Sequence, residues 1–164
     1  MTFVDHAPDR HYGRYGTLVL FLILTLGVGA VSGFATAGEI GGWYATLHRP
    51  SFAPPNWVFG PVWTALYAVM GIAAWRVWRV TGLMSRPLLL FFLQLALNFA
   101  WSFIFFKAHR IDAALIEIVV LLGFIVWTTA VFARRDRIAA LLFVPYIAWV
   151  GFATALNAAF WRLN

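Results

Sequence analysis

Long runs of apolar residues without a charged side chain dominate the pattern of this chain. Five such runs occupy residues 17–37, 58–75, 87–106, 118–133 and 138–161. The hydrocarbon core of a bilayer, about 30 Å thick, needs about 20 apolar residues of helix at a rise of about 1.5 Å each. The second and fourth runs reach that length when they are extended to Arg79 and back to Ile111. The pattern therefore predicts an all-α integral membrane protein, a bundle of five transmembrane helices.

The segment between the first two runs, residues 38–57, is neither a plain loop nor a span. Three prolines in it prevent one continuous helix, because each proline removes a backbone donor and clashes with the preceding turn. We expect a short helix followed by an extended stretch. Aromatic side chains are costly to leave in water, so the segment should fold over the bundle and cap a pocket. Its expected anchors are Trp43, Tyr44, Leu47, Phe52 and Trp57.

Residues 1–15 carry many charged and polar side chains and predict a flexible polar tail at the amino terminus. The connections between the other runs are short and leave no room for a domain outside the membrane. Residues 16–164 are therefore expected to form one transmembrane domain.

Composition and charge agree with a membrane protein. The chain of 164 residues is 63% hydrophobic and only 11% charged. The formal net charge of +6 could suggest nucleic acid, but the basic residues flank the apolar runs instead of forming a stripe. Eight lie on the side of the amino terminus: Arg10, Arg14, Arg76, Arg79, Arg86, Arg134, Arg135 and Arg137. Four lie on the other side: Arg49, Lys107, Arg110 and Arg162. This bias predicts the amino terminus inside and the first loop outside.

Candidate chemistry is sparse. The chain has no cysteine, its four histidines lie in the tail or in loops, and no metal site or haem-ligating histidine is expected. No serine, histidine and acid combination or phosphate-binding loop stands out, which argues against hydrolase or nucleotide chemistry. Glu117 is the one acid well inside a span. It could line a cavity or contact Lys107 or Arg110, and a carboxylate reaching back to the interface is the preferred interpretation.

Polar and aromatic residues recur at helical spacing within three of the runs, so that each set shares one helix face. The sets are Trp63, Tyr67 and Met70 in the second run; Gln94, Asn98 and Trp101 in the third; and Tyr146, Trp149, Ala153 and Asn157 in the fifth. Such stripes predict an interior cavity for a flat, largely apolar ligand held by stacking and a few hydrogen bonds. Ordinary helix packing, with the amides as interhelical contacts, is the alternative.

Pairs of small residues permit close approach of helices. Gly29 and Gly33 form one such pair in the first run, and Ala96 and Ala100 form another in the third. Either pair could serve a homodimer or internal packing.

The stretch WYATLHRPSFAPPNWVFGPVWTALY, residues 43–67, resembles the signature loop and second helix of the TspO, or peripheral-type benzodiazepine receptor, family. Two further blocks are similar to the family's third and fifth helices: QLALNFAWSFIFF, residues 94–106, and FVPYIAWVGFATALNAAFWRLN, residues 143–164. The resemblance covers the chain from about residue 16 onward.

This resemblance implies a five-helix bundle, usually a homodimer, whose first loop closes a pocket for porphyrins, sterols and synthetic isoquinoline or benzodiazepine ligands. No cofactor is required, and a porphyrin such as protoporphyrin IX or haem is expected as ligand. The bacterial cell envelope is the expected location. The residues matching the family's pocket are Tyr44, Phe59, Val62, Trp63, Asn98, Trp101, Trp149, Ala153 and Leu156.

The chain departs from the animal members of that family at two places. Their cholesterol-recognition pattern needs a tyrosine where this chain has Ala158, although Leu156 and Arg162 are kept. Such patterns carry little weight even when intact, so porphyrin-type ligands are favoured over sterols. A tryptophan near the start of their fourth helix is Ala113 here, which indicates a different far wall of the pocket.

Three functions are compatible with these features. The first is a receptor or sensor that binds tetrapyrroles. The second is a transporter that moves the ligand across the bilayer, suggested by the lid-like loop and by Pro145 in the fifth run. The third is an enzyme that degrades porphyrin with light and oxygen, in which Trp63 and Trp149 would be the catalytic residues. Binding and sensing is preferred, because no set of residues demands catalysis.

Overall fold

The computed structural model describes the backbone of residues 10–164 and the side chains of residues 15–164. Over this part of the chain every regular element is helical. The elements are α1 (Arg10–Gly41), α2 (Trp43–Thr46), α3 (Asn56–Thr81), α4 (Arg86–Ser102), the π-helical turn η1 (Phe103–Lys107), α5 (Ile111–Ala133) and α6 (Arg137–Leu163).

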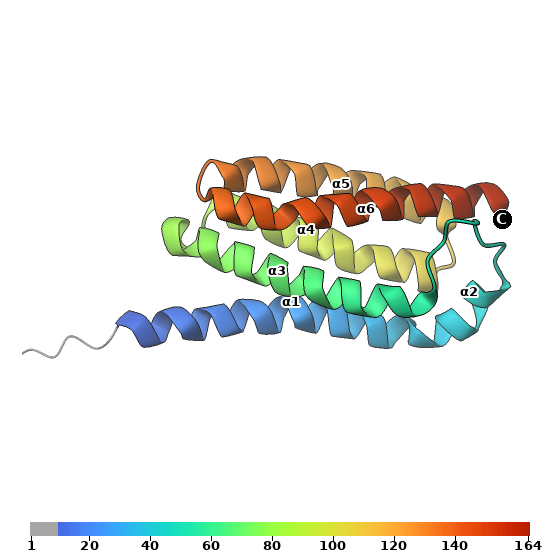
Figure 1. The fold of residues 1–164 in the computed structure, drawn as a ribbon, viewed down its shortest axis with the longest axis horizontal. Helices are drawn as coiled ribbons and strands as arrows, with labels where there is room; N and C mark the ends of the chain where they lie inside the picture. Colours follow the sequence, from blue (N-terminus) through green and yellow to red (C-terminus); the bar gives the residue numbers. More distant parts are fainter. Residues whose placement is uncertain (1–9) are drawn as a thin grey trace, which may run out of the picture.

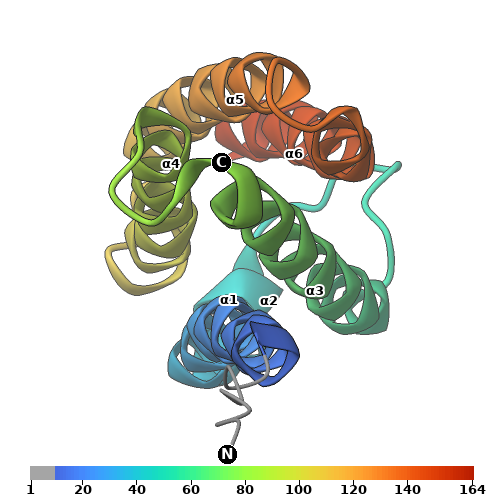
Figure 2. The same cartoon turned by 90° about the vertical axis from the view of Figure 1, so that its left-hand side faces the viewer.

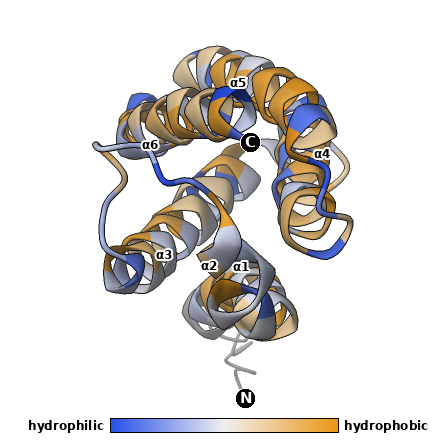
Figure 3. Cartoon of the chain, turned by 90° about the vertical axis from the view of Figure 1, so that its right-hand side faces the viewer, coloured by the Kyte–Doolittle hydropathy of each residue, from blue (hydrophilic) through white to orange (hydrophobic). Residues whose placement is uncertain are grey.

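Five of these helices are long and apolar enough to cross a membrane, which confirms the predicted spans. They are Tyr15–Gly41, Asn56–Thr81, Arg86–Lys107, Ile111–Ala133 and Arg137–Leu163. Much of their apolar surface faces outward, as on Phe34, Ile116 and Leu141. Figure 3 shows hydrophobic residues along the outer sides of α4 and α5 as well as inside the bundle. An exterior of this kind needs lipid as its solvent.

The five long helices run side by side along the long axis of the molecule (Figure 1). The connections α3–α4 and α5–α6 lie at one end, and α2, its flanking loops and the carboxyl terminus lie at the other. Seen from the end in Figure 2, α5 and α6 cover one side of the bundle and α1 stands on the opposite side, next to α3. Helix α1 packs chiefly on α3, with fewer contacts to α4.

Helix α1 begins earlier than the sequence pattern predicts. We expect a flexible tail over residues 1–15, whereas the helix already begins at Arg10. No proline interrupts the sequence from there to Gly41, so the helix can propagate beyond the apolar run at little cost. Residues 1–9 of the predicted tail lie outside the described residues.

The end of the bundle with the α5–α6 connection is fixed by one carboxylate. Asp136 stands immediately before α6, and its Oδ1 accepts a hydrogen bond of 2.9 Å from the backbone N–H of Ala139, which caps the helix. Its Oδ2 lies 2.9 Å from a guanidinium nitrogen of Arg76 on α3. One side chain therefore begins α6 and ties it to α3.

Helices α1 and α3 approach each other most closely at glycines. A Cβ atom on Gly71 of α3 would lie 2.7 Å from Oγ1 of Thr25 and 3.1 Å from the carbonyl oxygen of Phe21 on α1. A Cβ atom on Gly29 would overlap the ring of Tyr67. Gly29 therefore serves packing inside the bundle, whereas a Cβ atom on Gly33 would meet nothing within 4 Å, so internal packing fits only the first glycine of the predicted pair.

Substitution of Gly71 by alanine should loosen the contact between α1 and α3. The backbone of Phe21 cannot move aside cheaply, so we expect a loss of about 1–3 kcal/mol in the free energy of unfolding. Gly123→Ala on the exposed face of α5 is the matched control, because nothing lies within 4 Å of its Cβ position. Thermal unfolding in detergent should show a lower midpoint for Gly71→Ala only. Equal midpoints for both variants would contradict the close approach.

Candidate functional site

A cavity of about 690 Å³ lies inside the bundle, between α1, α3, α4 and α6. Helix α5 contributes none of its lining residues, and Tyr44 of α2 covers the cavity at the loop end. The volume falls within the range of about 300–1,000 Å³ that is typical of small-molecule sites. The structure therefore contains the interior cavity that the stripes of aromatic residues predict.

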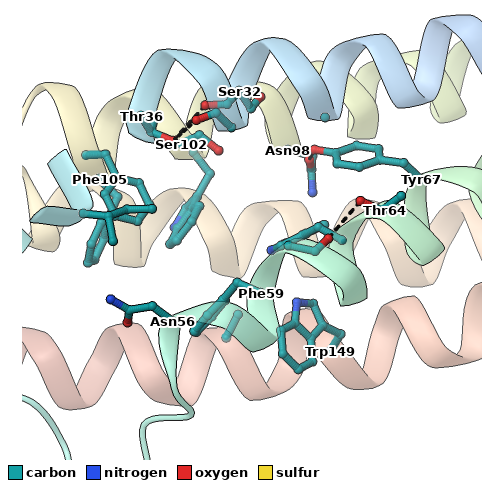
Figure 4. A pocket seen from close by; sticks show the side chains of 18 of the residues that line it. Ser32, Thr36, Asn56, Phe59, Thr64, Tyr67, Asn98, Ser102, Phe105 and Trp149 are labelled. Carbon is teal, nitrogen blue, oxygen red and sulfur yellow. Dashed lines mark hydrogen bonds between the residues drawn. The ribbon is translucent and has the colours of Figure 1, made fainter. Parts of the chain in front are cut away.

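Aromatic rings form most of the wall opposite α1. Trp149 of α6 packs edge-on against Phe59 of α3, with ring centroids 5.8 Å apart. Trp101 of α4 stacks on Phe105 at 5.1 Å and donates a hydrogen bond of 3.2 Å from Nε1 to Oδ1 of Asn157. Figure 4 shows Phe59 and Trp149 on one side of the space and Phe105 at its end. Flat rings on several sides suit a flat apolar ligand, which they can contact through their faces or edges.

The predicted lid is present, as a short helix followed by an extended stretch. Tyr44 of α2 is buried, and its ring lies 5.3 Å from that of Phe160 and 5.6 Å from that of Phe106. Next to it, Trp43 stacks on His109 at 4.2 Å, and His109 Nε2 lies 3.1 Å from Oε2 of Glu39. These contacts hold α2 against the end of the bundle.

The extended part of the lid is fastened by two amides. Oδ1 of Asn164 accepts a hydrogen bond of 2.9 Å from the backbone N–H of His48, and its Nδ2 donates one of 3.2 Å to the carbonyl oxygen of His48. Arg49 donates to Oδ1 of Asn56 at 3.0 Å and to the carbonyl oxygen of Pro54 at 2.9 Å. The end of α6 thus holds the stretch between α2 and α3.

A chain of hydrogen bonds connects the cavity wall with the packed core. The Tyr67 hydroxyl donates to Oδ1 of Asn98. Nδ2 of Asn98 donates to the Tyr146 hydroxyl oxygen at 3.0 Å, and that hydroxyl donates to Oε1 of Gln94 at 2.9 Å. All four side chains are buried, and they join α3, α4 and α6. Tyr67 and Asn98 border the cavity, whereas Tyr146 and Gln94 lie behind them.

Two polar atoms at the cavity have no hydrogen-bond partner among the described residues. They are Oγ of Ser32 on α1 and Nε1 of Trp149 on α6, and both are shielded from solvent. Ser32 lies close to Tyr67, whose hydroxyl donates to Asn98. The two side chains approach the space from opposite sides (Figure 4). An unpaired buried polar group costs free energy, so a ligand that reaches either atom gains a hydrogen bond that the protein alone does not make.

The structure brings most of the predicted pocket residues together. Eight of them border the cavity: Tyr44, Phe59, Trp63, Asn98, Trp101, Trp149, Ala153 and Leu156. Val62 does not, because its side chain packs against the core behind this wall. Among the residues of the aromatic stripes, Met70, Gln94 and Tyr146 are also core residues. One helix face is wide enough to border the cavity and pack in the core at the same time. Helical spacing alone therefore does not distinguish cavity residues from core residues.

Helix α1 supplies a wall of the cavity that the sequence analysis misses. Its lining residues are Leu26, Gly29, Ala30, Ser32, Gly33, Thr36 and Ile40. Small side chains leave the space open along this wall. The signal that could have found it is the pair Ser32 and Thr36, two hydroxyls four residues apart within an apolar run.

Three other expectations need correction. Of the five lid anchors, Phe52 and Trp57 remain 52% and 75% exposed, although Phe52 contacts Phe152 of α6 and Trp57, in the first turn of α3, borders the cavity. Glu117 does not reach the interface, since both its carboxylate oxygens are buried. It also does not contact Lys107 or Arg110, which pair instead with Glu39 and Asp112.

Comparison with known proteins agrees with this architecture. The sequence profile of the TspO/MBR family matches residues 21–162. The chain belongs to the TspO/MBR family. It is 41% identical over 149 residues to the tryptophan-rich protein TspO of Archaeoglobus fulgidus, covering 90% of this chain and 96% of that protein.

Two further members of the TspO/MBR family extend the comparison. The human translocator protein is 43% identical over 126 residues, which is 74% of this chain and 75% of the human protein. The tryptophan-rich sensory protein of Cereibacter sphaeroides is 37% identical over 145 residues, which is 88% of this chain and 91% of that protein. This TspO/MBR chain is therefore a multi-pass membrane protein, and it spans most of the length of its relatives.

Removal of the amide of Asn164 should free the extended part of the lid. Asn164→Ala deletes both bonds to His48, each worth about 0.5–1.5 kcal/mol, so we expect backbone amides near His48 to exchange roughly five- to hundredfold faster. Hydrogen exchange followed by mass spectrometry measures this. Arg162→Ala, an exposed neighbour, is the control. Unchanged exchange in Asn164→Ala would show that other contacts hold the lid.

Proposed function

We propose that this chain is a membrane receptor or sensor that binds a porphyrin, or a related flat hydrophobic ligand, in the cavity. The observation that carries the proposal is the cavity itself, which is walled by aromatic rings and holds two buried polar atoms without partners. Stacking supplies affinity for a flat ring system, and a few fixed polar groups supply orientation.

The polar atoms suggest how such a ligand is oriented. Nε1 of Trp149 can only donate, so it selects a hydrogen-bond acceptor on the ligand. Oγ of Ser32 can donate or accept on the opposite side of the space. Asn98 is already engaged by two tyrosines, and Asn157 is engaged by Trp101 and the carbonyl oxygen of Ile111. Among the buried polar atoms of the lining, Oγ of Ser32 and Nε1 of Trp149 are therefore the two that the described residues leave without a partner.

The orientation in the membrane follows from the charges at the two ends of the bundle. The end with the α3–α4 and α5–α6 connections carries Arg76, Arg79, Arg86, Arg134, Arg135 and Arg137. Basic residues next to spans favour the inner side of a membrane, which places the lid outside. We assign the protein to a bacterial cell envelope, with a ligand that enters from the outer side beneath the lid.

A homodimer through α4 fits the distribution of small and apolar residues. Leu89, Leu93, Ala96 and Ala100 follow one another at spacings of four, three and four residues, and the first three are exposed. Alanines at the centre of such a stripe let two helices approach closely. The corresponding glycine pair of α1 faces inward, so α4 is the better candidate for the interface.

Replacement of Trp149 by phenylalanine tests the binding site. The change keeps a ring but removes the donor, so the dissociation constant for protoporphyrin should rise roughly two- to tenfold. Saturable quenching of tryptophan fluorescence in purified protein measures it. Trp127→Phe is the matched control, because Trp127 is exposed on α5, far from the cavity lining. Quenching that never saturates, or equal affinities in both variants, would refute the proposed site.

Two further measurements on the purified protein distinguish binding from transport and from porphyrin degradation. Movement of porphyrin into or out of proteoliposomes, reduced in the Asn164→Ala variant, would indicate transport. Loss of porphyrin absorbance under light and oxygen in the wild type, but not in a Trp63→Phe and Trp149→Phe double variant, would indicate degradation. Saturable binding without either change supports a sensor.

The dimer can be tested by cross-linking, because the natural chain contains no cysteine. Ala96→Cys should form a disulfide-linked dimer in membranes under mild oxidation, since equivalent positions face each other across the proposed interface. Ile116→Cys, exposed on α5, is the control and should remain monomeric. Equal cross-linking of the two variants on denaturing gels would exclude the α4 interface.

A further inference from the structure

Glu117 stands apart from the cavity, on the inner side of α5, and is half-buried. It lies three residues after Ala114 and four before Leu121, both of which are buried, so the three share one face of the helix. Both carboxylate oxygens are shielded from solvent and make no hydrogen bond with any described residue. The carboxylate is therefore enclosed by the bundle without a partner.

The basic groups near that end of α5 do not neutralise Glu117. Nζ of Lys107 on η1 lies 3.1 Å from Oε1 of Glu39, and the guanidinium of Arg110 lies 2.8 Å from Oδ2 of Asp112. The ionisable side chain that faces Glu117 from α6 is Tyr146, which is within its electrostatic reach. Tyr146 is bonded in turn to the neutral amides Asn98 and Gln94 of α4. Among the side chains that the structure describes, no cation therefore pairs with Glu117.

An isolated carboxylate in an apolar interior is far more costly than a neutral carboxylic acid. A buried carboxyl group without a cation consequently takes up a proton. The protonated acid can donate one hydrogen bond and accept another, which fits neutral polar neighbours.

One such neighbour is unsatisfied. Nε2 of Gln94 is buried without a partner, whereas Oε1 of the same amide accepts from Tyr146. Gln94 and Tyr146 form the inner end of the chain that begins with Tyr67 and Asn98 at the cavity wall. Helix α5, which carries Glu117, packs on both α4 and α6, the helices of Gln94 and Tyr146.

We propose that Glu117 is a proton-binding site inside the bundle, coupled to the ligand cavity through Tyr146 and Asn98. In the resting state the side chain is a neutral carboxylic acid. Loss of the proton to water leaves a negative charge within electrostatic reach of Tyr146 and attracts its hydroxyl proton. A hydroxyl that turns toward the carboxylate no longer donates to Oε1 of Gln94. Its oxygen, which accepts from Nδ2 of Asn98, shifts with it, so the cavity wall at Asn98 moves.

Infrared spectroscopy tests the proton site without any ligand. The wild-type protein at neutral pH should show the carbonyl stretching band of a buried, protonated carboxylic acid, and Glu117→Gln should lack it. Asp112→Asn, on the same helix but exposed, should retain the band. If the glutamine variant fails to fold, Glu117→Asp should shift the band. No such band in the wild type, or one that survives in Glu117→Gln, overturns the proposal.

A second measurement tests the coupling, and this part rests on the proposed function. The probe is a neutral isoquinoline carboxamide, which does not itself titrate near neutral pH. Its dissociation constant should rise about fivefold or more as the infrared band disappears at high pH, and should stay constant in Glu117→Gln. A constant affinity in the wild type overturns the coupling. Failure of the probe to bind at any pH counts against the proposed function, while the infrared result still decides the proton site.

Discussion

Three helices of this bundle are held in register by the hydrogen bonds among Tyr67, Asn98, Tyr146 and Gln94. In lipid the apolar exterior gives helices little reason to associate, so interior polar contacts and close packing set their positions. Each of the four side chains would be costly in the bilayer and has most of its partners only in this arrangement. These hydrogen bonds fix α3, α4 and α6 relative to one another as a frame. Helix α1 covers the remaining side and approaches α3 closely at Gly29 of α1 and Gly71 of α3.

That frame explains why the cavity is open where it is. The aromatic residues on α3, α4 and α6 are large, but the hydrogen bonds behind them prevent collapse toward the centre. On α1 the facing positions are small, among them Ala30, Gly33 and Ser32. Large rings on fixed helices opposite small residues on another leave a flat space, and the lid closes one end of it.

Much of this was readable from the sequence, because the bilayer imposes simple rules. Lengths of apolar runs gave the five spans, and prolines gave the division of the lid. Helical spacing and the family resemblance together found eight residues of the cavity. Spacing could not tell that Gln94 and Tyr146 face the core while Asn98 faces the cavity, since they share helix faces with cavity residues. It also missed the wall formed by α1, because small residues such as glycine and alanine give no aromatic or amide signal. It placed Glu117 at the interface, because an unpaired charge is ordinarily too costly to bury.

The length of α1 ties the cavity to the surrounding lipid. Its apolar run, residues 17–37, extends about 31 Å, close to a hydrocarbon core of about 30 Å. In a thinner bilayer such a helix adapts by tilting, at modest cost. Because α1 forms one wall of the cavity and is packed mainly on a single neighbour, a change in its tilt alters the width of the space. The shape of the binding site will therefore differ between membranes of different thickness or sterol content.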